Sequence, residues 1–336
     1  MGQLPFERMD RSILVRQEAR TNEEFGCDPE SRDMKELLDY GIITIDKPSG
    51  PTSHQVSAFV QNILNISKSG HSGTLDPKVT GVLPVAIGRG TRIVQSLLTA
   101  GKEYVCLMHL HDPVEEETLR NVIEKQFTGK IKQIPPVKSA VKRRLRFRKI
   151  YYFDIIEIKG QEVLFKVGTQ AGTYIRKLCH DIGEALGCGA HMAELRRTKA
   201  GPFQENTMIT LQDLTDAYHY YVENKDESRL RKFIKPIEHG VKHLPKVWVT
   251  DMTINTICNG ASLKAPGIAK VESDIQVDEP VAIMSLKGEL VSVAQSLMRS
   301  KDMITKERGV ACRSSQVFMK PGTYPKMDNN KHSLRA

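Results

Sequence analysis

The stretch Gly-His-Ser-Gly-Thr-Leu-Asp-Pro-Lys-Val-Thr-Gly-Val-Leu-Pro at residues 70–84 sets one carboxylate, Asp76, among small and turn-forming residues. Pro77 follows it, and a residue before proline is disfavoured in the α region of backbone space. Asp76 could therefore cap a helix that begins at Pro77. A cap is the ordinary interpretation of an Asp-Pro step, so a catalytic interpretation needs companion residues elsewhere in the chain.

Two other segments supply such companions. Tyr104, in Gly-Lys-Glu-Tyr, offers a flat apolar face and a hydroxyl, which RNA-binding sites use to stack on unpaired bases. Tyr174 and Arg176 lie at the junction of a predicted strand and helix, and an arginine facing Asp76 would hold that carboxylate ionised and oriented. Each of these residues taken alone is more typical of a structural role.

A cluster of positive charge follows Pro135-Pro136 and contains no compensating acid. Its seven cations are Lys138, Lys142, Arg143, Arg144, Arg146, Arg148 and Lys149. Such a run predicts contact with phosphates, although a solvated surface loop is the alternative. The net charge of +9 fits a polyanionic partner such as nucleic acid, or simply a basic enzyme.

Several classes of protein lack support in the sequence. There is no apolar run of about 18 residues and no signal peptide, so we expect a cytoplasmic protein without a membrane partner. Walker A, Rossmann and His-Glu-x-x-His motifs are absent, which disfavours NTPases, dehydrogenases and metalloproteases. One Cys/His cluster stands out, but we interpret it as packing within a helical pattern and not as a metal site. Its members are Cys179, His180, Cys188 and His191.

Hydrophobic periodicity and turn residues predict secondary structure along most of the chain. The expected elements are a strand at 40–46, a helix capped by Ser53, a loop at 67–73, a helix at 114–127, a hairpin of 151–158 and 162–169, a helix at 174–186 ended by Gly187, a helix from Thr210 to Tyr221 with a Thr210–Asp213 capping box, and a hairpin of 280–286 and 290–294.

A change in character near residue 245 divides the chain. We expect an N-terminal arm at 1–36 that packs on the C-terminal domain, a catalytic domain at 37–245, a small β-rich domain at 246–325 and a disordered tail at 326–336.

Taken together, the motifs resemble those of the TruB-type pseudouridine synthases over residues 38–240. The matching segments, in family order, are 45–53 (IDKPSGPTS), 70–85 (GHSGTLDPKVTGVLPV), 101–104 (GKEY), 135–142 (PPVKSAVK), 172–178 (GTYIRKL) and 192–203 (MAELRRTKAGPF). The resemblance implies an α+β fold, in which a mixed, largely antiparallel sheet is flanked by helices and followed by a small β-rich RNA-binding PUA domain.

Within that family, the motif sequences resemble most closely those of the dyskerin-like catalytic subunit of box H/ACA ribonucleoproteins. Residues 186–197 (LGCGAHMAELRR) are similar in sequence to that branch of the family. Residues 260–271 and 281–290 look like its PUA domain. The chain has no long lysine- and glutamate-rich tail, which favours the archaeal form. Ile134 departs from the branch, where arginine is more usual, and this puts one RNA contact in doubt.

The resemblance implies isomerisation of uridine to pseudouridine in rRNA and tRNA, with no cofactor and no metal. Asp76 would act as a nucleophile at C1′ or as a base at the 2′ hydrogen, and the residues do not choose between these roles. Substrate contacts would come from Tyr104, stacked on the flipped base, and from Tyr174, Arg176, Leu195 and His71. RNA contacts would come from Lys47 and from the basic run Lys138, Lys142, Arg143, Arg144, Arg146 and Arg148.

The implied partners are a guide RNA, a target rRNA or tRNA and the small proteins of the H/ACA particle. A stand-alone enzyme that modifies the T-loop of tRNA is the alternative with the same chemistry. A catalytically inactive RNA-binding scaffold is a third hypothesis. The joint presence of Asp76, Tyr104, Tyr174 and Arg176 argues against it.

Overall fold

The computed structural model describes residues 2–135 and 142–326 and divides into two compact units. Among these residues, the first unit comprises 2–8 and 38–234, and the second comprises 9–37 and 235–326. The domain limits expected at residues 37 and 246 stay predictions. The disordered tail expected at 326–336 lies, from residue 327 onward, outside the described residues.

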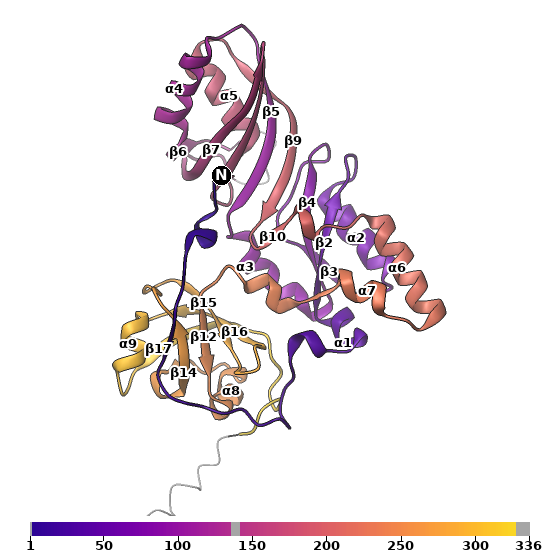
Figure 1. The fold of residues 1–336 in the computed structure, drawn as a ribbon, viewed down its shortest axis with the longest axis vertical. Helices are drawn as coiled ribbons and strands as arrows, with labels where there is room; N and C mark the ends of the chain where they lie inside the picture. The colour runs from indigo at the N-terminus through magenta and orange to yellow at the C-terminus, as the bar shows by residue number, and fades with distance from the viewer. Residues whose placement is uncertain (1, 136–141, 327–336) are drawn as a thin grey trace, which may run out of the picture. The chain divides into compact units, whose positions relative to one another are not determined.

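The first unit is built on a large, mostly antiparallel sheet (Figure 1). Its strands run in the order β2 (Gly41–Lys47), β4 (Thr80–Ile87), β9 (Ala190–Ala200), β5 (Lys102–Leu110), β8 (Glu162–Thr169), β7 (Arg146–Lys159) and β6 (Gly129–Gln133). Two short strands, β3 (Ser69–His71) and β10 (Phe203–Gln204), pair with β4 and β9. Only the β4–β9 pairing is parallel within this set of strands. The predicted α+β class is therefore confirmed.

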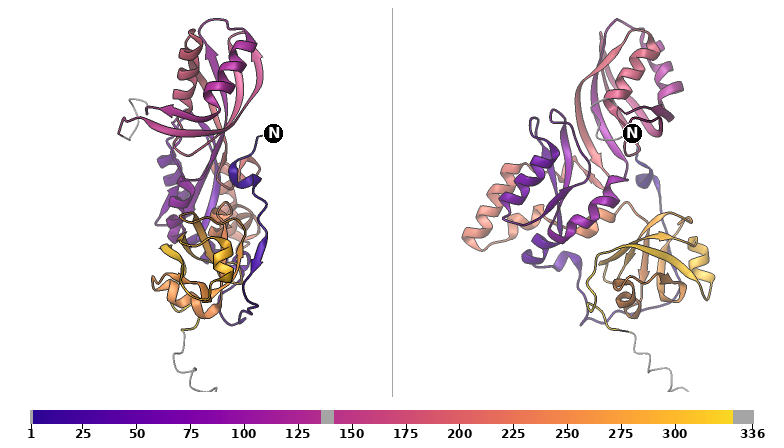
Figure 2. Two further views of the ribbon diagram at one scale, coloured as in Figure 1. Left: turned by 90° about the vertical axis from the view of Figure 1, so that its left-hand side faces the viewer. Right: turned by 180° about the vertical axis from the view of Figure 1, so that it is seen from behind.

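Helices cover this sheet in two groups (Figures 1 and 2). Helices α4 (Glu116–Phe127) and α5 (Ile175–Leu186) pack together and bury an apolar core against β5, β8 and β9. Helices α2 (Ser53–Ile63) and α6 (Leu211–Asn224) pack together, with α2 also against β3 and β4. Further short elements in this part of the chain are α1 (Met34–Asp39), α3 (Val94–Leu98), α7 (Ser228–Phe233) and β11 (Lys235–Pro236).

Two local predictions near the sheet are wrong. The cap of α2 is Thr52 and not Ser53, since Thr52 and Gln55 form a reciprocal capping box. The Ser53 hydroxyl instead forms hydrogen bonds with the backbone of Leu75. The loop expected at 67–73 contains β3, a three-residue strand whose backbone pairs with β4 despite its polar sequence.

Other local signals behave as the sequence predicts. The Thr210–Asp213 capping box opens α6. Helix α5 ends at Gly187, whose φ of 73° lies in the left-handed region that favours glycine. The predicted hairpins are also present, as β7 with β8 and as β15 (Pro280–Met284) with β16 (Leu290–Ser296).

The second unit is a smaller sheet with two short helices. Its strand order is β1 (Ile13–Val15), β14 (Ile268–Glu272), β12 (Lys246–Val249), β15, β16, β17 (Val310–Val317) and β13 (Leu263–Lys264). Helices α8 (Asp251–Cys258) and α9 (Ser300–Thr305) complete it around a core of aliphatic side chains. In the described part of the chain, no helix combines the length and apolar character needed to cross a membrane.

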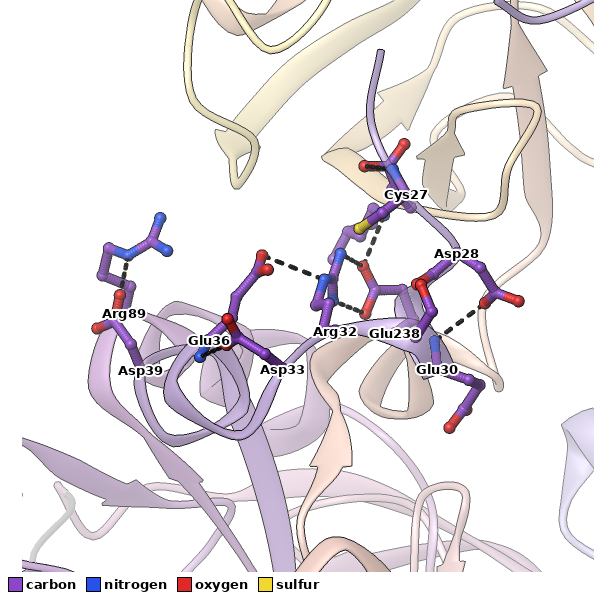
Figure 3. A network of polar contacts seen from close by, with 12 residues as sticks. Cys27, Asp28, Glu30, Arg32, Asp33, Glu36, Asp39, Arg89 and Glu238 are labelled. Carbon is purple, nitrogen blue, oxygen red and sulfur yellow. Dashed lines mark hydrogen bonds and ion pairs between the residues drawn. The ribbon is translucent and has the colours of Figure 1, made fainter. Parts of the chain in front are cut away.

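The segment 9–37 is an integral part of this second unit. Strand β1 pairs antiparallel with β14, and Arg16 donates to the carbonyls of Met303 and Ile304 at 2.8 Å each. Arg32 makes two hydrogen bonds to Glu238, at 2.7 and 2.9 Å (Figure 3). Burial disfavours the Arg32 charge, but Glu238 more than compensates and raises the pKa of Arg32. The buried ion pair therefore anchors this segment within the unit.

Candidate active site

Asp76 and Arg176 form an ion pair at the surface of the first unit. Asp76 follows β3 in a loop, and Arg176 lies in the first turn of α5. Their side chains are 52% and 54% exposed, so the pair is open to a ligand. Asp76 caps no helix, because residues 77–78 form a turn closed by a bond from the Val79 amide to the Asp76 carbonyl at 3.0 Å. The structure thus brings together the predicted pair and removes the helix-cap alternative.

Buried polar side chains hold the loop that carries Asp76. The Ser53 hydroxyl accepts from the Leu75 amide at 2.8 Å and donates to the Leu75 carbonyl at 3.2 Å. Lys47, at the end of β2, donates its ammonium protons to the carbonyls of Pro48, Pro77 and Val79 at 2.8–2.9 Å. The backbone on both sides of Asp76 is therefore fixed by contacts to β2 and α2.

Lys47 was predicted to contact RNA, and its position requires a correction. The side chain is 0% exposed, and its three protons all have acceptors in the protein. Burial lowers the pKa of Lys47, while the Asp76 charge raises it and the Arg197 charge lowers it further. A fully buried ammonium cannot reach a phosphate, so the role that the structure gives Lys47 is to position the loop.

Arg197 is a buried cation that the sequence reasoning missed. It is 1% exposed, and it donates to the carbonyls of Val82 at 2.7 Å and Gly73 at 3.3 Å. Burial lowers the pKa of Arg197, while a charge interaction and a hydrogen bond with the Tyr104 side chain raise it in part. Among the described residues, no carboxylate forms an ion pair with Arg197. Its side chain links the loop before Asp76 to Tyr104.

A signal for Arg197 was present in the sequence. Successive side chains of a strand point to opposite faces, so one member of the Arg196-Arg197 doublet had to face the covered side of the sheet. Arg196 is the outward member, and it pairs with Asp46 and Glu205. Arg197 is the inward one.

The predicted aromatic and aliphatic residues border the same region. Tyr104 on β5 lies directly opposite Arg197 on β9, and Leu195 lies two residues earlier on β9. Tyr104 and Leu195 are both half-buried against the core under α5. Tyr174 immediately precedes α5, and Gln133 holds its backbone by two hydrogen bonds, at 3.1 and 3.2 Å. Tyr104 and Leu195 thus lie on neighbouring strands beneath α5, the helix whose first turn carries Arg176.

His71 lies on β3, close to the loop. Burial lowers its pKa, and the charges of Arg197 and His54 lower it further, against a smaller opposing effect of a hydrogen bond with the Gly73 backbone. Its imidazole is therefore neutral at neutral pH. The Nδ1 atom is buried and accepts or donates no hydrogen bond within the described residues. Because Nδ1 is buried, contact with a base would have to use the rest of this half-buried ring.

Part of the basic run precedes β7 and part begins it, since Lys142, Arg143 and Arg144 come before the strand. Lys142, Arg143 and Arg144 are exposed, whereas Arg146 and Arg148 are half-buried. Arg148 donates to the carbonyl of Gly172 at 3.1 Å, in the turn that leads to Tyr174 and α5. Lys138 lies outside the described residues. The described cations thus form an exposed basic segment that is tied to the site by Arg148.

The Cys/His cluster does not gather into one site. Cys179 is buried with its sulfur 3.6 Å from that of Cys106. His191 instead contacts His111 at 3.0 Å. Over the described ranges, no group of three or more His, Cys, Asp or Glu side chains is arranged to hold a metal ion.

Lys102 should make the stability of the first unit depend on pH. Its buried ammonium donates to the carbonyls of Leu97, Leu98 and Ala100 at 2.8–2.9 Å, and burial, reinforced by the Arg197 charge, lowers its pKa to about 7. Between that pH and the ordinary pKa of 10.5, the unfolded chain binds more protons than the folded one. We therefore expect the free energy of unfolding to rise as pH increases above about 7.

Urea unfolding of the wild type and of Lys102→Met at pH 6.5–9.5, below the range in which tyrosines ionise, measures this effect. The wild type should gain stability with pH more steeply than the variant. Equal slopes for the two proteins would contradict the prediction.

Comparison with known proteins identifies the family. Residues 61–175 match the N-terminal domain described as TruB family pseudouridylate synthase, residues 176–242 the tRNA pseudouridylate synthase B C-terminal domain, residues 2–57 the DKCLD (NUC011) domain and residues 245–318 the PUA domain. A relative from Methanopyrus kandleri, described as probable tRNA pseudouridine synthase B, is 54% identical over 96% of this chain and 95% of its own length. The chain belongs to the TruB family of pseudouridylate synthases. The family predicted from the motifs is confirmed.

Other proteins similar to this TruB-family chain support the same family assignment. The protein described in the same words from Methanothermobacter thermautotrophicus is 54% identical over 94% of this chain and 97% of its own length. Two solved structures are similar over nearly their full length. One, described as a Cbf5-Nop10-Gar1 complex, has a TM-score of 0.92 and 51% identity over 97% of this chain and 99% of that one. The other, an H/ACA RNP bound to a substrate RNA containing 2′-deoxyuridine, has a TM-score of 0.89 and 49% identity over 96% and 99%.

Proposed function

We propose that this TruB-family chain is a cytoplasmic pseudouridine synthase of rRNA and tRNA that is directed by a box H/ACA guide RNA. The observation that carries the proposal is the exposed Asp76–Arg176 pair on a rigidly held loop, which Arg197 links to the strand position opposite it, Tyr104. An open carboxylate of this kind suits chemistry on a nucleotide that has left its helix.

The reaction is an isomerisation that needs no oxidant and no group donor. The N1–C1′ bond of uridine breaks, C1′ bonds to C5, the C5 proton is lost and N1 gains a proton. Positive character builds at C1′ as the first bond breaks, and a carboxylate stabilises or traps it. Asp76 would do this as a nucleophile at C1′, or would remove the 2′ hydrogen as a base. The ion pair with Arg176 orients the carboxylate for either role.

The residues around the pair have proposed roles in holding the base. Tyr104 would stack on the flipped uracil, and its hydroxyl is held by a hydrogen bond with Arg197 on the neighbouring strand. Tyr174 and Leu195 would line the pocket, with His71 as a further contact. The phosphates on either side of the target uridine would be bound by the basic residues Lys142, Arg143, Arg144, Arg146 and Arg148.

The proposed partners follow from the similar structures. The complex with Nop10 and Gar1 and the H/ACA particle with substrate RNA both contain a chain similar to this one over nearly its whole length. We therefore infer that this chain also assembles with a guide RNA and small H/ACA proteins. Residues 246–325 would serve as its RNA-binding PUA domain, in line with the match at 245–318.

A second candidate function is a stand-alone synthase acting on the T-loop of tRNA. The curated relatives named probable tRNA pseudouridine synthase B favour it. Both candidates use the same active site, so the difference lies in how the target uridine is presented.

An assay with two substrates separates these candidates. The purified chain is incubated with an unmodified tRNA transcript and, separately, with a target RNA plus its H/ACA guide and the small H/ACA proteins, and pseudouridine is mapped. We expect modification of the target RNA only when its guide is present. Modification confined to the T-loop would favour the stand-alone enzyme, and no product on either RNA would contradict both.

A further inference from the structure

Strand β9 carries one residue more than its partner β5 at the level of Tyr104. Glu103 pairs with Lys199, and the next residue, Tyr104, pairs with Arg197. Thr198 is thus left without a partner on β5 and forms a β-bulge. Without this bulge, Thr198 would lie opposite Tyr104, and Arg197 would be displaced by one position to the other face of the sheet. The bulge therefore brings Arg197 to the same face as Tyr104.

A buried carboxylate holds the bulge residue in place. Glu103 is 4% exposed, and its Oε1 atom accepts a hydrogen bond from the Thr198 hydroxyl at 2.7 Å. This bond joins the residue before Tyr104 to the residue after Arg197. A shift of β9 by one position would carry Thr198 away from Glu103 and break the bond. The contact is therefore specific for the register that places Arg197 opposite Tyr104.

The other oxygen of Glu103 is held from a different strand. The Tyr152 hydroxyl, on β7, donates to Oε2, and the Lys199 ammonium lies 3.7 Å from the same atom. Gly168 on β8 pairs with both Glu103 and Tyr152, and a Cβ atom at Gly168 would lie 2.1 Å from the Tyr152 ring. Glycine at this position thus leaves room for the ring to reach across β8. Burial and the bond to Glu103 raise the pKa of Tyr152, which keeps its proton on the phenol.

A role in stability does not by itself account for this arrangement. Burying a carboxylate is costly, and well-packed apolar side chains of similar volume often stabilise a fold at least as well as a buried ionic group. Bulges, in turn, are frequent next to active sites, where they change the direction of a side chain. Here the buried carboxylate and the bulge coincide, one residue away from both Tyr104 and Arg197.

We propose that Glu103 is a positioning residue for pseudouridine formation, which holds the bulge at Thr198 so that Arg197 stays opposite Tyr104 and keeps the stacking ring in place. The inference rests on the proposed function, since it assigns Glu103 a part in the same reaction. Glu103 acts through its neighbours and does not itself contact the base, because its side chain is buried.

Two variants that each remove one hydroxyl from Glu103 test this role. Thr198→Val releases the bulge residue, and the matched control Tyr152→Phe removes a donor on a strand that does not carry Arg197. The assay is single-turnover pseudouridine formation on a target RNA with its guide and the small H/ACA proteins, at increasing enzyme concentration. Thr198→Val should lower the saturating rate by about 10- to 100-fold, up to the loss typical of a 1 Å misplacement. Its half-saturating concentration should not change, and Tyr152→Phe should keep most of the rate.

Fluorine NMR follows the Tyr104 ring directly and does not depend on activity. The full chain is labelled with 3-fluorotyrosine, and the resonance of Tyr104 is the one that is missing from Tyr104→Phe. Thr198→Val should shift or split this resonance, because the ring is no longer held. The resonances of Tyr218 and Tyr221 on α6 should stay in place, since a local change of register leaves that helix intact.

The conservative replacement of Glu103 adds a rescue test. Glu103→Gln can accept from one hydroxyl and donate to the other, so it should keep the rate and the Tyr104 resonance of the wild type. Glu103→Leu can do neither, and it should behave like Thr198→Val. If Thr198→Val does not fold, Glu103→Leu takes its place in both measurements.

The outcomes separate the inference from the proposed function. An unchanged Tyr104 resonance in Thr198→Val would overturn the inference, as would equal saturating rates of Thr198→Val and Tyr152→Phe in a preparation that forms pseudouridine. A wild type that forms no pseudouridine would instead overturn the proposed function. The fluorine resonance would then still show whether Glu103 holds Tyr104 in place.

Discussion

Replacing Asp76 by asparagine should reduce pseudouridine formation by more than about 10³-fold, within the range typical of a positioned carboxylate in proton transfer. Asparagine keeps the size of the side chain and an oxygen for Arg176. It has no negative charge with which to stabilise C1′, and it is neither a nucleophile nor a base here. The measurement is a single-turnover assay with RNA tritiated at C5 of the target uridine, because that hydrogen is released to water.

Binding distinguishes a chemical defect from a folding defect. Asp76 is exposed and the loop around it is held by Ser53 and Lys47, so Asp76→Asn should bind the target RNA and unfold like the wild type. Arg176→Lys, which keeps the charge but changes the geometry, should be intermediate in rate. Product formation by Asp76→Asn at the wild-type rate would contradict the assigned role.

The same assay can decide between the two roles of Asp76. If the carboxylate removes the 2′ hydrogen, a target uridine carrying deuterium at C2′ should react several times more slowly in the wild type. If the carboxylate attacks C1′, that C–H bond stays intact and the rate should hardly change. The comparison needs only the labelled RNA and no further variant.

Replacing Arg197 by methionine should reduce the single-turnover rate by about 100-fold, the order expected when catalytic groups are misplaced by about 1 Å. The variant loses the bonds that connect the Gly73 carbonyl, the Val82 carbonyl and the Tyr104 hydroxyl. Its stability should fall less, by at most about 3 kcal/mol, because three lost hydrogen bonds are partly offset by removal of a buried charge.

A double-mutant cycle identifies the route by which Arg197 acts. Tyr104→Phe keeps the ring but removes the hydroxyl that accepts from Arg197. If Arg197 works by positioning Tyr104, the losses in rate should be clearly less than additive in the double variant. Arg197→Lys should recover part of the rate, since it keeps the charge with fewer bonds. Fully additive losses would assign Arg197 a purely structural role.

The sequence predicted the residues that carry the chemistry of the site better than the buried residues that hold them in position. Asp76, Tyr104 and Arg176 were identified because their motifs recur in a fixed order, and the structure places Asp76 and Arg176 in contact. The sequence did not predict the buried, positioning roles of Lys47 and Arg197, because a lysine or arginine is ordinarily exposed. Their burial depends on carbonyl groups that only the folded loop brings within reach.

The errors in local structure have the same origin. Both Thr52 and Ser53 are good cap residues, and only the contact of Ser53 with Leu75 decides between them. Strand β3 has a polar, glycine-containing sequence with weak β propensity, and its extended form depends on pairing with β4. Predictions based on hydrophobic periodicity, such as α4 and the β7–β8 hairpin, succeeded because their signals are local.

The pairing of β1 with β14 has a consequence for synthesis. Ser12, next to β1, bonds to Ser273 across 261 residues of chain. A ribosome therefore completes β1 long before its partner strand exists, and the second unit cannot close until nearly the whole chain has emerged. Until then, the exposed side chains of Ile13 and Val15 lie on an unpaired edge that other chains can join. Strand β1 is thus open to aggregation for most of translation, including the period after the segments that carry the catalytic residues have been made.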